Sequence, residues 1–335
     1  MPVGLSVTVQ KKSWPLRQVF RISRGAKTTA EVIEVTLSDG TYQGRGECVP
    51  YGRYGETLDT VAGAIQSVIP DIELGADRQA LQLLLPAGAA RNALDCAFWD
   101  LEAKRAGVRL WDMLGTPAPA GCVTAFTISY DSTHGMAAAA KKVAGRPVLK
   151  MKVGSLGDVD KVRAVHQAAP QAQLILDANE GWDCLGFQGV MDGLKKLDHA
   201  VDCITAIEQP LPVGDDHILR AGHHEFNLVA DESCHTRDSL QALVGRYDGV
   251  NIKLDKTGGL TEALLLKKQA EDMGFKIMIG CMVGSSLAMA PAMMLCREAE
   301  WVDLDGPLWL GQDQDPPLHI DSKSLMALPD TILWG

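Results

Sequence analysis

Several features that mark particular classes of protein are missing from this sequence. Acidic residues outnumber lysine and arginine, the formal net charge is −10, and no Lys/Arg-rich run occurs. We therefore expect no nucleic-acid partner, because such a partner requires a basic face. The eight cysteines form no C-x-x-C pair, which favours reduced, mostly buried thiols in a cytoplasmic protein. Residues 1–9 are too short and too interrupted for the apolar core of a secretory signal.

A long unbroken hydrophobic run is missing as well. The 20 residues from Ile277 to Cys296 carry no charge, and that is about the length of a membrane span. Glycines, serines and Pro291 interrupt the segment. A buried strand, a glycine turn and a buried helix explain it better, so we expect no membrane partner.

The first third of the chain has the pattern of an α+β domain. Residues 32–37 and 41–44 read as two strands around the turn Asp39-Gly40. Helical stretches follow at 57–68 and 89–105, and the second has one apolar face. The Pro- and Gly-containing segment 115–121 is the clearest linker in the sequence.

After this linker, short apolar runs recur, each followed by a turn and a segment of helix length. There are eight of them, at 123–128, 148–153, 174–176, 203–207, 227–230, 249–254, 276–279 and 301–304. Strands alternating with helices indicate parallel βαβ units, and eight such units indicate a closed (β/α) barrel. The 185 residues from Gly121 to Asp305 are fewer than the roughly 250 of a typical barrel. We therefore expect short helices, with one of them dispensable.

Polar, mostly charged residues lie at the ends of most of these runs, at the end where a barrel of this kind carries its active site. Several stand two residues apart, and such pairs point to the same face of a strand. We therefore expect these side chains to converge on one cavity. They are Lys150, Lys152, Asp177, Asn179, Glu208, Asp231, Lys253, Asp303 and Asp305.

The strand numbers predict how these groups face one another. Lys152 and Lys253 follow the second and sixth strands, which lie opposite each other in a ring of eight. Asp177, Glu208 and Asp231 follow the three strands between them. Three converging carboxylates repel one another and raise one another's pKa unless a cation lies among them. Oxygen ligands without His or Cys predict Mg²⁺, or Mn²⁺, rather than Zn²⁺.

This arrangement predicts proton transfer at the α-carbon of a carboxylate substrate. With the substrate carboxylate on the metal, the α-carbon would lie between the two lysines. Loss of its proton creates an enediolate, whose charge a metal stabilises. One lysine removes the proton and the other returns one to the opposite face. We expect Lys150, as a neighbouring like charge, to lower the pKa of Lys152.

The eighth strand lies opposite the fourth, so we expect Asp303 and Asp305 far from the metal, at a cationic group on the distal end of the substrate. Other interpretations remain open. An aspartate at a strand end often caps a helix, the lysine pair could form a solvated rim, and the aspartate pair could close the barrel floor. Asn179 is expected to support the metal ligands or to act as a cap. Asp255 and Lys256 are expected to form a local ion pair.

The strand-end motifs resemble those of the enolase superfamily, in its muconate lactonizing subgroup. The motifs K-x-K, D-x-N, E-Q-P, D-E-S and N-x-K begin at residues 150, 177, 208, 231 and 251. Longer stretches at 46–51, 85–96, 230–237, 250–263 and 303–307 resemble the L-Ala-D/L-Glu epimerases, a family of dipeptide epimerases. The resemblance covers nearly the whole chain. The superfamily is known for a Lys or His base that acts with Mg²⁺.

The resemblance implies an α/β fold of two domains. A (β/α)7β TIM-like barrel would span 119–307, beneath an α+β capping domain at 1–118, and the tail 308–335 would pack back onto the cap. Loops at 17–25 and 50–55 would close over the substrate and exclude water. The implied activity is that of an isomerase acting on a small dipeptide, in the recycling of cell-wall peptides. The segment 280–286 departs from the family pattern, which leaves the side-chain specificity open.

The resemblance also implies substrate contacts. The Asp-x-Asp pair would bind the free ammonium group of a dipeptide, and Arg24 lies where the family places a cation for the distal carboxylate. The full set of candidates is Asp303, Asp305, Arg24, Asp255, Tyr54 and Thr127. The sequence leaves open whether several copies of the chain assemble.

Three rival functions remain. The chain could be a dipeptide epimerase of different specificity. A cycloisomerase or an o-succinylbenzoate synthase would use the same lysines and metal, but neither needs to bind an ammonium group, so Asp303 and Asp305 count against them. A non-catalytic relative would have no reason to keep three carboxylates and both lysines. Exchange of the substrate α-proton distinguishes this last possibility from the enzymes.

Overall fold

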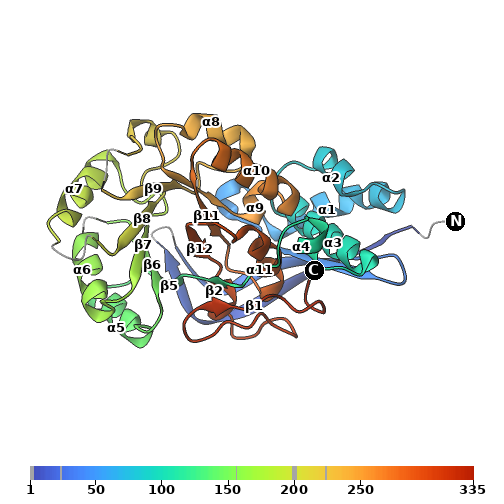
Figure 1. The fold of residues 1–335 in the computed structure, drawn as a ribbon, viewed down its shortest axis with the longest axis horizontal. Coiled ribbons are helices and arrows are strands. Elements are labelled where there is room, and N and C mark those ends of the chain that lie inside the picture. Colours follow the sequence, from blue (N-terminus) through green and yellow to red (C-terminus); the bar gives the residue numbers. More distant parts are fainter. Residues whose placement is uncertain (1–3, 23–24, 156, 198–201, 223–224) are drawn as a thin grey trace.

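The computed structural model describes residues 4–22, 25–155, 157–197, 202–222 and 225–335. It has two parts, which lie side by side in Figure 1. The first is an N-terminal α+β unit that we call the cap, and the second is a parallel barrel. Arg24, one of the candidate substrate contacts, lies outside the described residues.

The cap is built on an antiparallel sheet of order β1-β2-β3. Strand β1 (Ser6–Ile22) pairs with β2 (Gly25–Ser38), which pairs with β3 (Gln43–Cys48). The sequence analysis missed β1, because lysines and Pro15 obscure its alternation. Residues 17–22 belong to β1 and Gly25 begins β2, so our expectation of a loop there is wrong for these residues, while residues 23 and 24 lie outside the described part and closure over the substrate stays a prediction.

Helices cover one face of this sheet. They are α1 (Leu58–Glu73), α2 (Arg78–Leu84) and α3 (Ala89–Ala106), followed by the short α4 (Leu110–Met113). Helix α3 packs so closely on β3 that a Cβ atom at Gly46 would lie 2.1 Å from the Ala93 carbonyl oxygen. The cap core therefore requires glycine at that position. The predicted helices at 57–68 and 89–105 are confirmed.

The barrel contains the eight predicted strands, all parallel and in sequence order. The first and last strands are joined by a hydrogen bond of 2.8 Å from the Ala125 amide to the Val302 carbonyl. The (β/α) barrel predicted from the sequence is thereby confirmed. Its strands are β5 (Phe126–Ile128), β6 (Val148–Lys152), β7 (Gln173–Asp177), β8 (Ile204–Glu208), β9 (Asn227–Ala230), β10 (Gly249–Ile252), β11 (Lys276–Gly280) and β12 (Trp301–Asp303).

The helices of the barrel are short, as its length predicts. After β8, the described residues contain only the 3-10 turn Asp215–Ile218 where a full helix would stand. A two-stranded ribbon of β4 (Cys122–Val123) and β13 (Leu325–Met326) lies outside the barrel. The helices are α5 (Thr133–Lys142), α6 (Asp158–Ala168), α7 (Cys184–Leu194), α8 (Leu240–Leu243), α9 (Leu254–Thr257), α10 (Leu260–Asp272), α11 (Ser286–Ala292) and α12 (Gly306–Trp309).

Strand alternation divides the barrel residues between two cores. On β7, Leu174 and Leu176 pack outward into the large core beneath the helices. Ile175 points inward, into a small core of six buried residues. Asp177 is two residues from Ile175 and shares its face. The apolar filling of the barrel thus ends in charged groups at the carboxyl ends of the strands.

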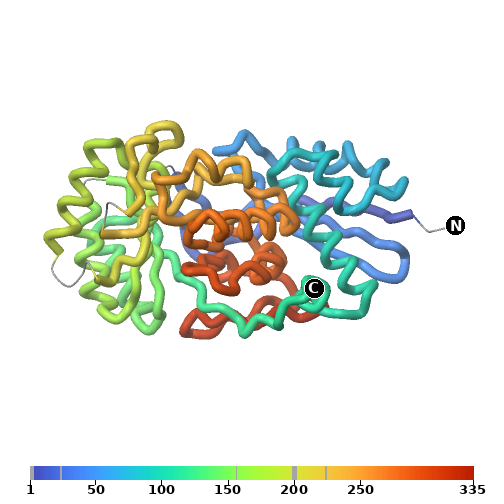
Figure 2. The backbone as a smooth tube through the Cα atoms, turned by 45° about the horizontal axis from the view of Figure 1, so that its top comes forward, coloured from blue at the N-terminus to red at the C-terminus, as the bar shows by residue number. Residues whose placement is uncertain are grey.

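The C-terminal segment returns to the cap. In Figure 2 it runs beside the linker that follows α4 and ends near α3. The Trp334 indole donates to the Cys96 carbonyl, at 3.1 Å, and the Gly335 amide donates to Asp100, at 2.7 Å. These contacts agree with a tail that packs on the cap, while the domain boundaries at 118/119 and 307/308 stay predictions.

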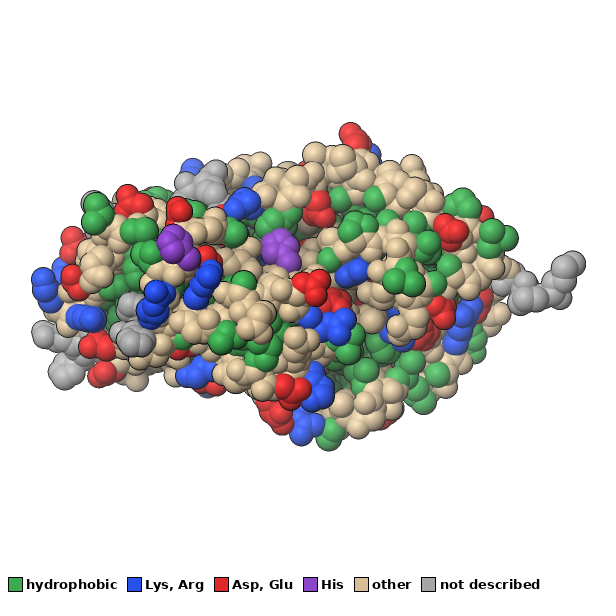
Figure 3. All heavy atoms as spheres, turned by 90° about the horizontal axis from the view of Figure 1, so that it is seen from above, with side chains coloured by type: hydrophobic (Ala, Val, Ile, Leu, Met, Phe, Trp, Pro, Cys, Tyr) green, Lys and Arg blue, Asp and Glu red, His purple; other side chains and the backbone are tan. Residues whose placement is uncertain are grey.

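The uncharged segment 277–296 forms β11, a turn and the buried helix α11, as predicted. None of the helices in the described part of the chain combines the length and apolar character needed to cross a bilayer. Acidic and basic side chains are interspersed on the face shown in Figure 3. All eight cysteines are free thiols, but only Cys48, Cys96 and Cys234 are fully buried, so our expectation of mostly buried thiols is wrong.

Candidate active site

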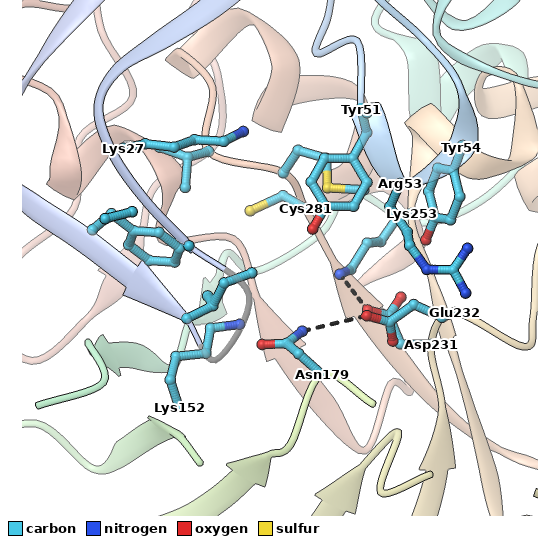
Figure 4. A pocket seen from close by; sticks show the side chains of 17 residues that line it. Lys27, Tyr51, Arg53, Tyr54, Lys152, Asn179, Asp231, Glu232, Lys253 and Cys281 are labelled. Carbon is cyan, nitrogen blue, oxygen red and sulfur yellow. Dashed lines mark hydrogen bonds and ion pairs between the residues drawn. The ribbon is translucent and has the colours of Figure 1, made fainter. Parts of the chain in front are cut away.

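A cavity of about 470 Å³ lies between the cap and the carboxyl ends of the barrel strands. Figure 4 shows its walls. The barrel contributes both predicted lysines and part of the acidic wall, and the cap contributes the tip of the β1–β2 hairpin and the loop at 51–54. The lining residues are Phe20, Ile22, Gly25, Ala26, Lys27, Tyr51, Gly52, Arg53, Tyr54, Lys152, Asn179, Asp231, Glu232, Lys253, Cys281, Met282 and Val283.

The two lysines lie on opposite sides of this cavity, as the strand numbers predict. Lys152 ends β6, and Lys253 directly follows β10. Figure 4 shows their ammonium groups entering from different walls. Their residues are only 7% and 6% exposed. A small molecule between them would therefore be within reach of a proton donor or acceptor on each face.

Three buried carboxylates lie along the wall that joins the lysines. Lys152 is in register with Asp177, and Asp177 is in register with Glu208. Asp231 follows the next strand, β9. All three carboxylates are 0–2% exposed. The predicted convergence of these groups is thus present in the fold.

Lysine ammonium groups lie among these carboxylates. Lys152 Nζ is 2.5 Å from Asp177 Oδ2, and Lys253 Nζ is 2.7 Å from Asp231 Oδ2. Lys150 Nζ lies 3.0 Å from Asp177 and 2.7 Å from Glu208. Its charge is therefore balanced by carboxylates, and its predicted effect on Lys152 stays a prediction.

The electrostatics show how strongly these groups are coupled. Burial raises the pKa of Glu208, the neighbouring Asp177 charge adds to this, and the result is about 7. Burial opposes the charge on Lys253, but the Asp231 and Glu208 carboxylates outweigh it and hold the lysine pKa well above its usual value. Burial likewise disfavours the Asp231 anion, yet the lysines keep its pKa well below the ordinary range.

The donor set fits a hard divalent cation. Asp177, Glu208 and Asp231 supply oxygen ligands and are buried, and burial together with the neighbouring carboxylate charges raises the pKa of Glu208. As the described side chains stand, no three acidic, His or Cys residues are grouped closely enough to hold an ion, because the ammonium groups lie between them. A cation that displaced those contacts would meet three carboxylates on neighbouring strand ends.

Two residues that the sequence analysis did not connect with Asp231 hold it in place. Gln209 accepts hydrogen bonds through Oε1 from the Asp231 amide (2.9 Å) and the Ser233 amide (3.1 Å). Lys256 Nζ donates to Asp231 Oδ1 and to its carbonyl oxygen, both at 2.6 Å. The expected ion pair between Asp255 and Lys256 is therefore wrong. The E-Q-P motif contains Gln209, but its spacing gives no sign of this contact.

Asn251 holds Glu208 in a similar way. Its Nδ2 donates to Glu208 Oε1 at 2.7 Å. A Cβ atom on Gly280, in the adjacent strand β11, would lie 2.5 Å from Asn251 Oδ1. Glycine at 280 therefore leaves the space that lets the asparagine reach the carboxylate.

Asp303 does not lie where we expected it. Its Oδ2 is 2.6 Å from Lys150 Nζ, the same atom that lies 2.7 Å from Glu208. The expectation that Asp303 sits far from the metal carboxylates is wrong, because the barrel is narrow enough for one long lysine to span it. Asp303 Oδ1 is buried and has no hydrogen-bond donor among the described residues.

The remaining predicted substrate contacts differ in whether they line the cavity. Asp305 accepts from the Thr127 amide at 2.7 Å and from the Trp309 indole at 3.2 Å, behind the cavity wall. Burial and the Asp303 charge raise its pKa to about 6. Tyr54 and Asn179 line the cavity.

Asp255 is turned toward the cap. Its carboxylate accepts from the Val49 amide at 3.0 Å and from Asn92 Nδ2 at 2.8 Å. Neither Asp255 nor Thr127 is among the residues that line the cavity. Both were assigned from the family resemblance, and their positions on or after a strand do not separate a cavity wall from a domain interface.

The sequence analysis missed most of the cap side of the cavity. Lys27 is the basic residue of the hairpin that lines the cavity, and its ammonium lies 5.4 Å from the centre of the Tyr51 ring. Burial lowers the pKa of Lys27. Met282 and Val283 add apolar surface from the segment after β11. Lys27 is identified only by the location of the adjoining ends of β1 and β2 over the barrel, which no local pattern reveals.

Two family models match the chain. The model for the mandelate racemase/muconate lactonizing enzyme N-terminal domain matches residues 5–115. The model for the enolase C-terminal domain-like family matches residues 135–331. Together they cover the cap and most of the barrel.

Individual relatives agree with these models. The chain is 44% identical to an L-Ala-D/L-Glu epimerase of Escherichia coli over 322 residues, which is 96% of this chain and 99% of the relative. It is 41% identical to an N-acetyl-D-glutamate racemase of a Pseudoalteromonas species, over 91% of this chain and 95% of the relative.

Solved structures share the fold. An enolase family member from Agrobacterium tumefaciens with homology to dipeptide epimerases, with bound sodium and L-Ala-L-Glu, superposes with a TM-score of 0.94 at 45% identity. The match covers 99% of this chain and 100% of that one. A dipeptide epimerase from Cytophaga hutchinsonii, complexed with Mg and D-Ala-L-Val, has a TM-score of 0.88 at 25% identity, over 98% of this chain and 94% of that one.

Proposed function

This chain belongs to the mandelate racemase/muconate lactonizing enzyme family of enolase-like proteins, and we propose that it is an L-Ala-D/L-Glu epimerase. As a member of this group of racemases and epimerases it is an isomerase. The observation that carries the proposal is the location of Lys152 and Lys253 on opposite walls of one cavity, next to Asp231.

The two lysines account for inversion of a stereocentre. In this mechanism a neutral amine on one wall takes the α-proton, and the ammonium on the other wall delivers a proton to the opposite face. Each positioned acid or base of this kind contributes roughly 10²–10⁴-fold to the rate. Asp177 contacts Lys152 and Asp231 contacts Lys253. A cation bound by these carboxylates would displace both contacts and leave the two lysines to face the substrate.

Asp177, Glu208 and Asp231 are the residues that would hold Mg²⁺, with Mn²⁺ as the alternative ion. When bound, the cation would supply positive charge beside the substrate carboxylate and stabilise the negative charge that develops as the α-proton leaves. The Mg-bound dipeptide epimerase of C. hutchinsonii supports this assignment.

Asp303 supports a substrate with a free ammonium group. Its Oδ1 is buried without a hydrogen-bond donor among the described residues. Together with Asp305, it raises the pKa of Cys281, after burial as the main cause, and Cys281 lines the cavity. A cation in the substrate would satisfy this carboxylate, whereas a cycloisomerase substrate offers none.

Lys27 supports an acidic side chain in the substrate. The cap side of the cavity also contributes the aromatic residues Phe20 and Tyr51 and a second cation, Arg53, which is paired with Glu180. In Figure 4, Lys27 lies across the cavity from Asp231 and Glu232. A dipeptide with its α-carboxylate at the acidic wall would extend its side chain toward this lysine. Arg24 stays a predicted partner for the same group.

The relationship to an N-acetyl-D-glutamate racemase makes N-acetylglutamate the second candidate substrate. It shares the distal carboxylate but carries no ammonium group, so it would leave Asp303 without a partner. A role in peptidoglycan recycling, a cytoplasmic location and assembly into oligomers remain parts of the proposal that follow from the family.

Proton NMR in D₂O tests the proposal. L-Ala-L-Glu, other L-Ala dipeptides and N-acetyl-L-glutamate are each incubated with the protein and Mg²⁺. Loss of the Glu α-proton signal with formation of L-Ala-D-Glu is the expected result. If only N-acetylglutamate exchanged its α-proton, N-acetylglutamate would be the substrate in place of the dipeptide. Absence of exchange in every compound, with Mg²⁺ binding demonstrated, would contradict the proposed epimerase.

A further inference from the structure

We propose that the ion pair between Arg53 and Glu180 is a clasp that fastens the cap loop 50–56 over the cavity. Arg53 would then be a positioning residue, which acts through Tyr51 and Tyr54 rather than on the substrate. The kinetic part of this inference rests on the proposed function, and its structural part does not.

The pair has the geometry of a strong contact between two domains. Arg53 Nε lies 2.8 Å from Glu180 Oε2, and Arg53 Nη2 lies 2.8 Å from Oε1. Such a bidentate contact fixes orientation as well as charge. The Val213 amide also donates to Glu180 Oε1, at 3.0 Å. The Glu180 side chain is only 6% exposed, while that of Arg53 is 40% exposed.

Glu180 is fixed to the barrel by its backbone. It follows the predicted metal ligand Asp177 by three residues, and both Asn179 and Glu180 adopt left-handed conformations, with φ of 46° and 64°. Non-glycine residues keep this conformation where the surroundings hold them. The Glu180 amide donates to the Gln209 carbonyl at 2.9 Å, and the Asn179 amide donates to Asp177 Oδ1 at 3.0 Å. The acceptor half of the clasp is thus built into the strand ends of the barrel.

Arg53 belongs to a loop that is anchored to the cap at its other end. Glu56 accepts from the Tyr51 amide at 3.1 Å and from the Ala89 amide, at the start of α3, at 2.8 Å. Between these anchors the loop has one short 3-10 turn, Gly52–Tyr54. The ion pair ties this turn across the gap to the end of β7.

The residues on either side of Arg53 form a wall of the cavity. The Tyr51 and Tyr54 rings meet edge to face, with centroids 5.3 Å apart. Tyr54 also packs on His235, which follows β9, at 4.5 Å. Lys27 lies over Tyr51. If Arg53 were released, this aromatic wall would become more mobile and water would enter the cavity. The ammonium group of Lys27 would then be positioned less precisely.

The test compares Arg53→Met, Glu180→Gln and the double variant. Arg105→Met is the matched control, because Arg105 also lies in the cap, pairs with Asp39 and has a side chain that is 41% exposed. Arg53→Lys is the conservative variant, which keeps the charge and loses the bidentate contact. The readouts are hydrogen–deuterium exchange of the peptide that covers 50–56, and KM and kcat for L-Ala-L-Glu.

We expect faster exchange at the amides of Tyr54 and Gly55 in both single variants, and about a tenfold rise in KM with a change in kcat of less than about threefold. The double variant should be no worse than either single variant, Arg53→Lys should be intermediate, and Arg105→Met should match the parent protein. Unchanged exchange at 50–56, or single effects that add in the double variant, would overturn the clasp.

If the parent protein turned over no dipeptide, the proposed function would fail, while the exchange measurement would still decide the inference. If the parent epimerises the dipeptide and the 50–56 peptide is unaffected by either variant, only the clasp fails.

Discussion

The two ends of the cavity differ in how their charged groups are held. At the barrel end, Lys253 is 6% exposed and Lys150 contacts three carboxylates. At the cap end, Lys27 contacts an aromatic ring, and Arg53 pairs with Glu180 through a side chain that is 40% exposed. Charged groups at the barrel end, such as Lys150 and Asp231, thus have several partners. On the proposed function, proton transfer would depend mainly on the barrel and recognition of the acidic side chain on the cap.

The largest effect is expected from the barrel end. Glu208→Gln removes one charge from the carboxylate set and should abolish tight Mg²⁺ binding. The fall in kcat/KM should be at least about 10³-fold, because several kcal/mol of charge stabilisation are lost. Calorimetric titration with Mg²⁺ and NMR turnover measure the two effects. Glu102→Gln, which alters the surface pair with Arg78 on the cap, is the control. If Glu208→Gln still bound Mg²⁺ tightly, the proposed difference between the barrel end and the cap end of the cavity would be contradicted.

A smaller effect is expected at Asp303, which lies between the two ends. Asp303→Asn should raise KM for L-Ala-L-Glu by about 100-fold, because a charged hydrogen bond to the substrate ammonium is lost. The N-acetylated dipeptide lacks that ammonium and should lose much less. Initial rates for both compounds measure the difference. Equal losses would assign Asp303 a structural role alongside Lys150.

The cap end should respond in selectivity rather than in rate. Lys27→Met should lower the preference for L-Ala-L-Glu over L-Ala-L-Gln by about fivefold, since a partly exposed charge pair contributes on the order of 1 kcal/mol. Lys11→Met, which removes a charge on the same hairpin near Asp59, is the matched control. Competition between the two dipeptides in one NMR sample gives the ratio. An unchanged ratio would assign recognition of the acidic side chain elsewhere in the cap.

The smallest effect on activity is expected at Glu47, where the cap contacts the barrel. Glu47, on β3, accepts from the Ser285 amide at 2.7 Å and from its hydroxyl at 2.6 Å. Burial raises the pKa of Glu47 from 4.5 to about 7. Between about pH 4.5 and pH 7, Glu47 therefore keeps its proton in the folded protein but has lost it in the unfolded chain. Stability from this group is fully present below about pH 4.5 and is lost as the pH rises toward 7.

Glu47→Gln removes this titration. Relative to the variant, the parent protein should lose stability on the order of 1.4 kcal/mol per pH unit across that window. Urea unfolding at about pH 5 and about pH 7 measures the difference between the two proteins. A difference that does not change with pH would show that Glu47 is ionised in the fold throughout, and that the cap and barrel are joined by a charged contact.

The barrel end could be predicted from the sequence because its signals are local. Each strand is a short apolar run, and the charged residue that ends it, such as Asp177 or Glu208, points inward by strand alternation. Opposite strands then place Lys152 and Lys253 across from each other. Distances across the barrel were less predictable. The long Lys150 side chain contacts both Asp303 and Glu208, and strand order alone does not show that these carboxylates share a partner.

The cap end could not be predicted in the same way. Lys27 and Tyr51 reach the cavity only because a long hairpin and a loop cross from one domain to the other. No periodicity in β1 distinguishes the strand end that faces the barrel from the rest. The error for Asp255 is the reverse. It was predicted to contact the substrate, but it follows a strand and faces the domain interface instead.

Proton exchange in single-lysine variants tests the central claim, that Lys152 and Lys253 act on opposite faces of one α-carbon. Lys152→Met and Lys253→Met are each incubated with L-Ala-L-Glu and with L-Ala-D-Glu in D₂O and Mg²⁺, and the Glu α-proton is followed by NMR. The two-lysine account predicts that each variant exchanges one diastereomer only, that the two variants choose opposite diastereomers, and that neither epimerises. Epimerisation by either variant, or exchange of the same diastereomer by both, would contradict it.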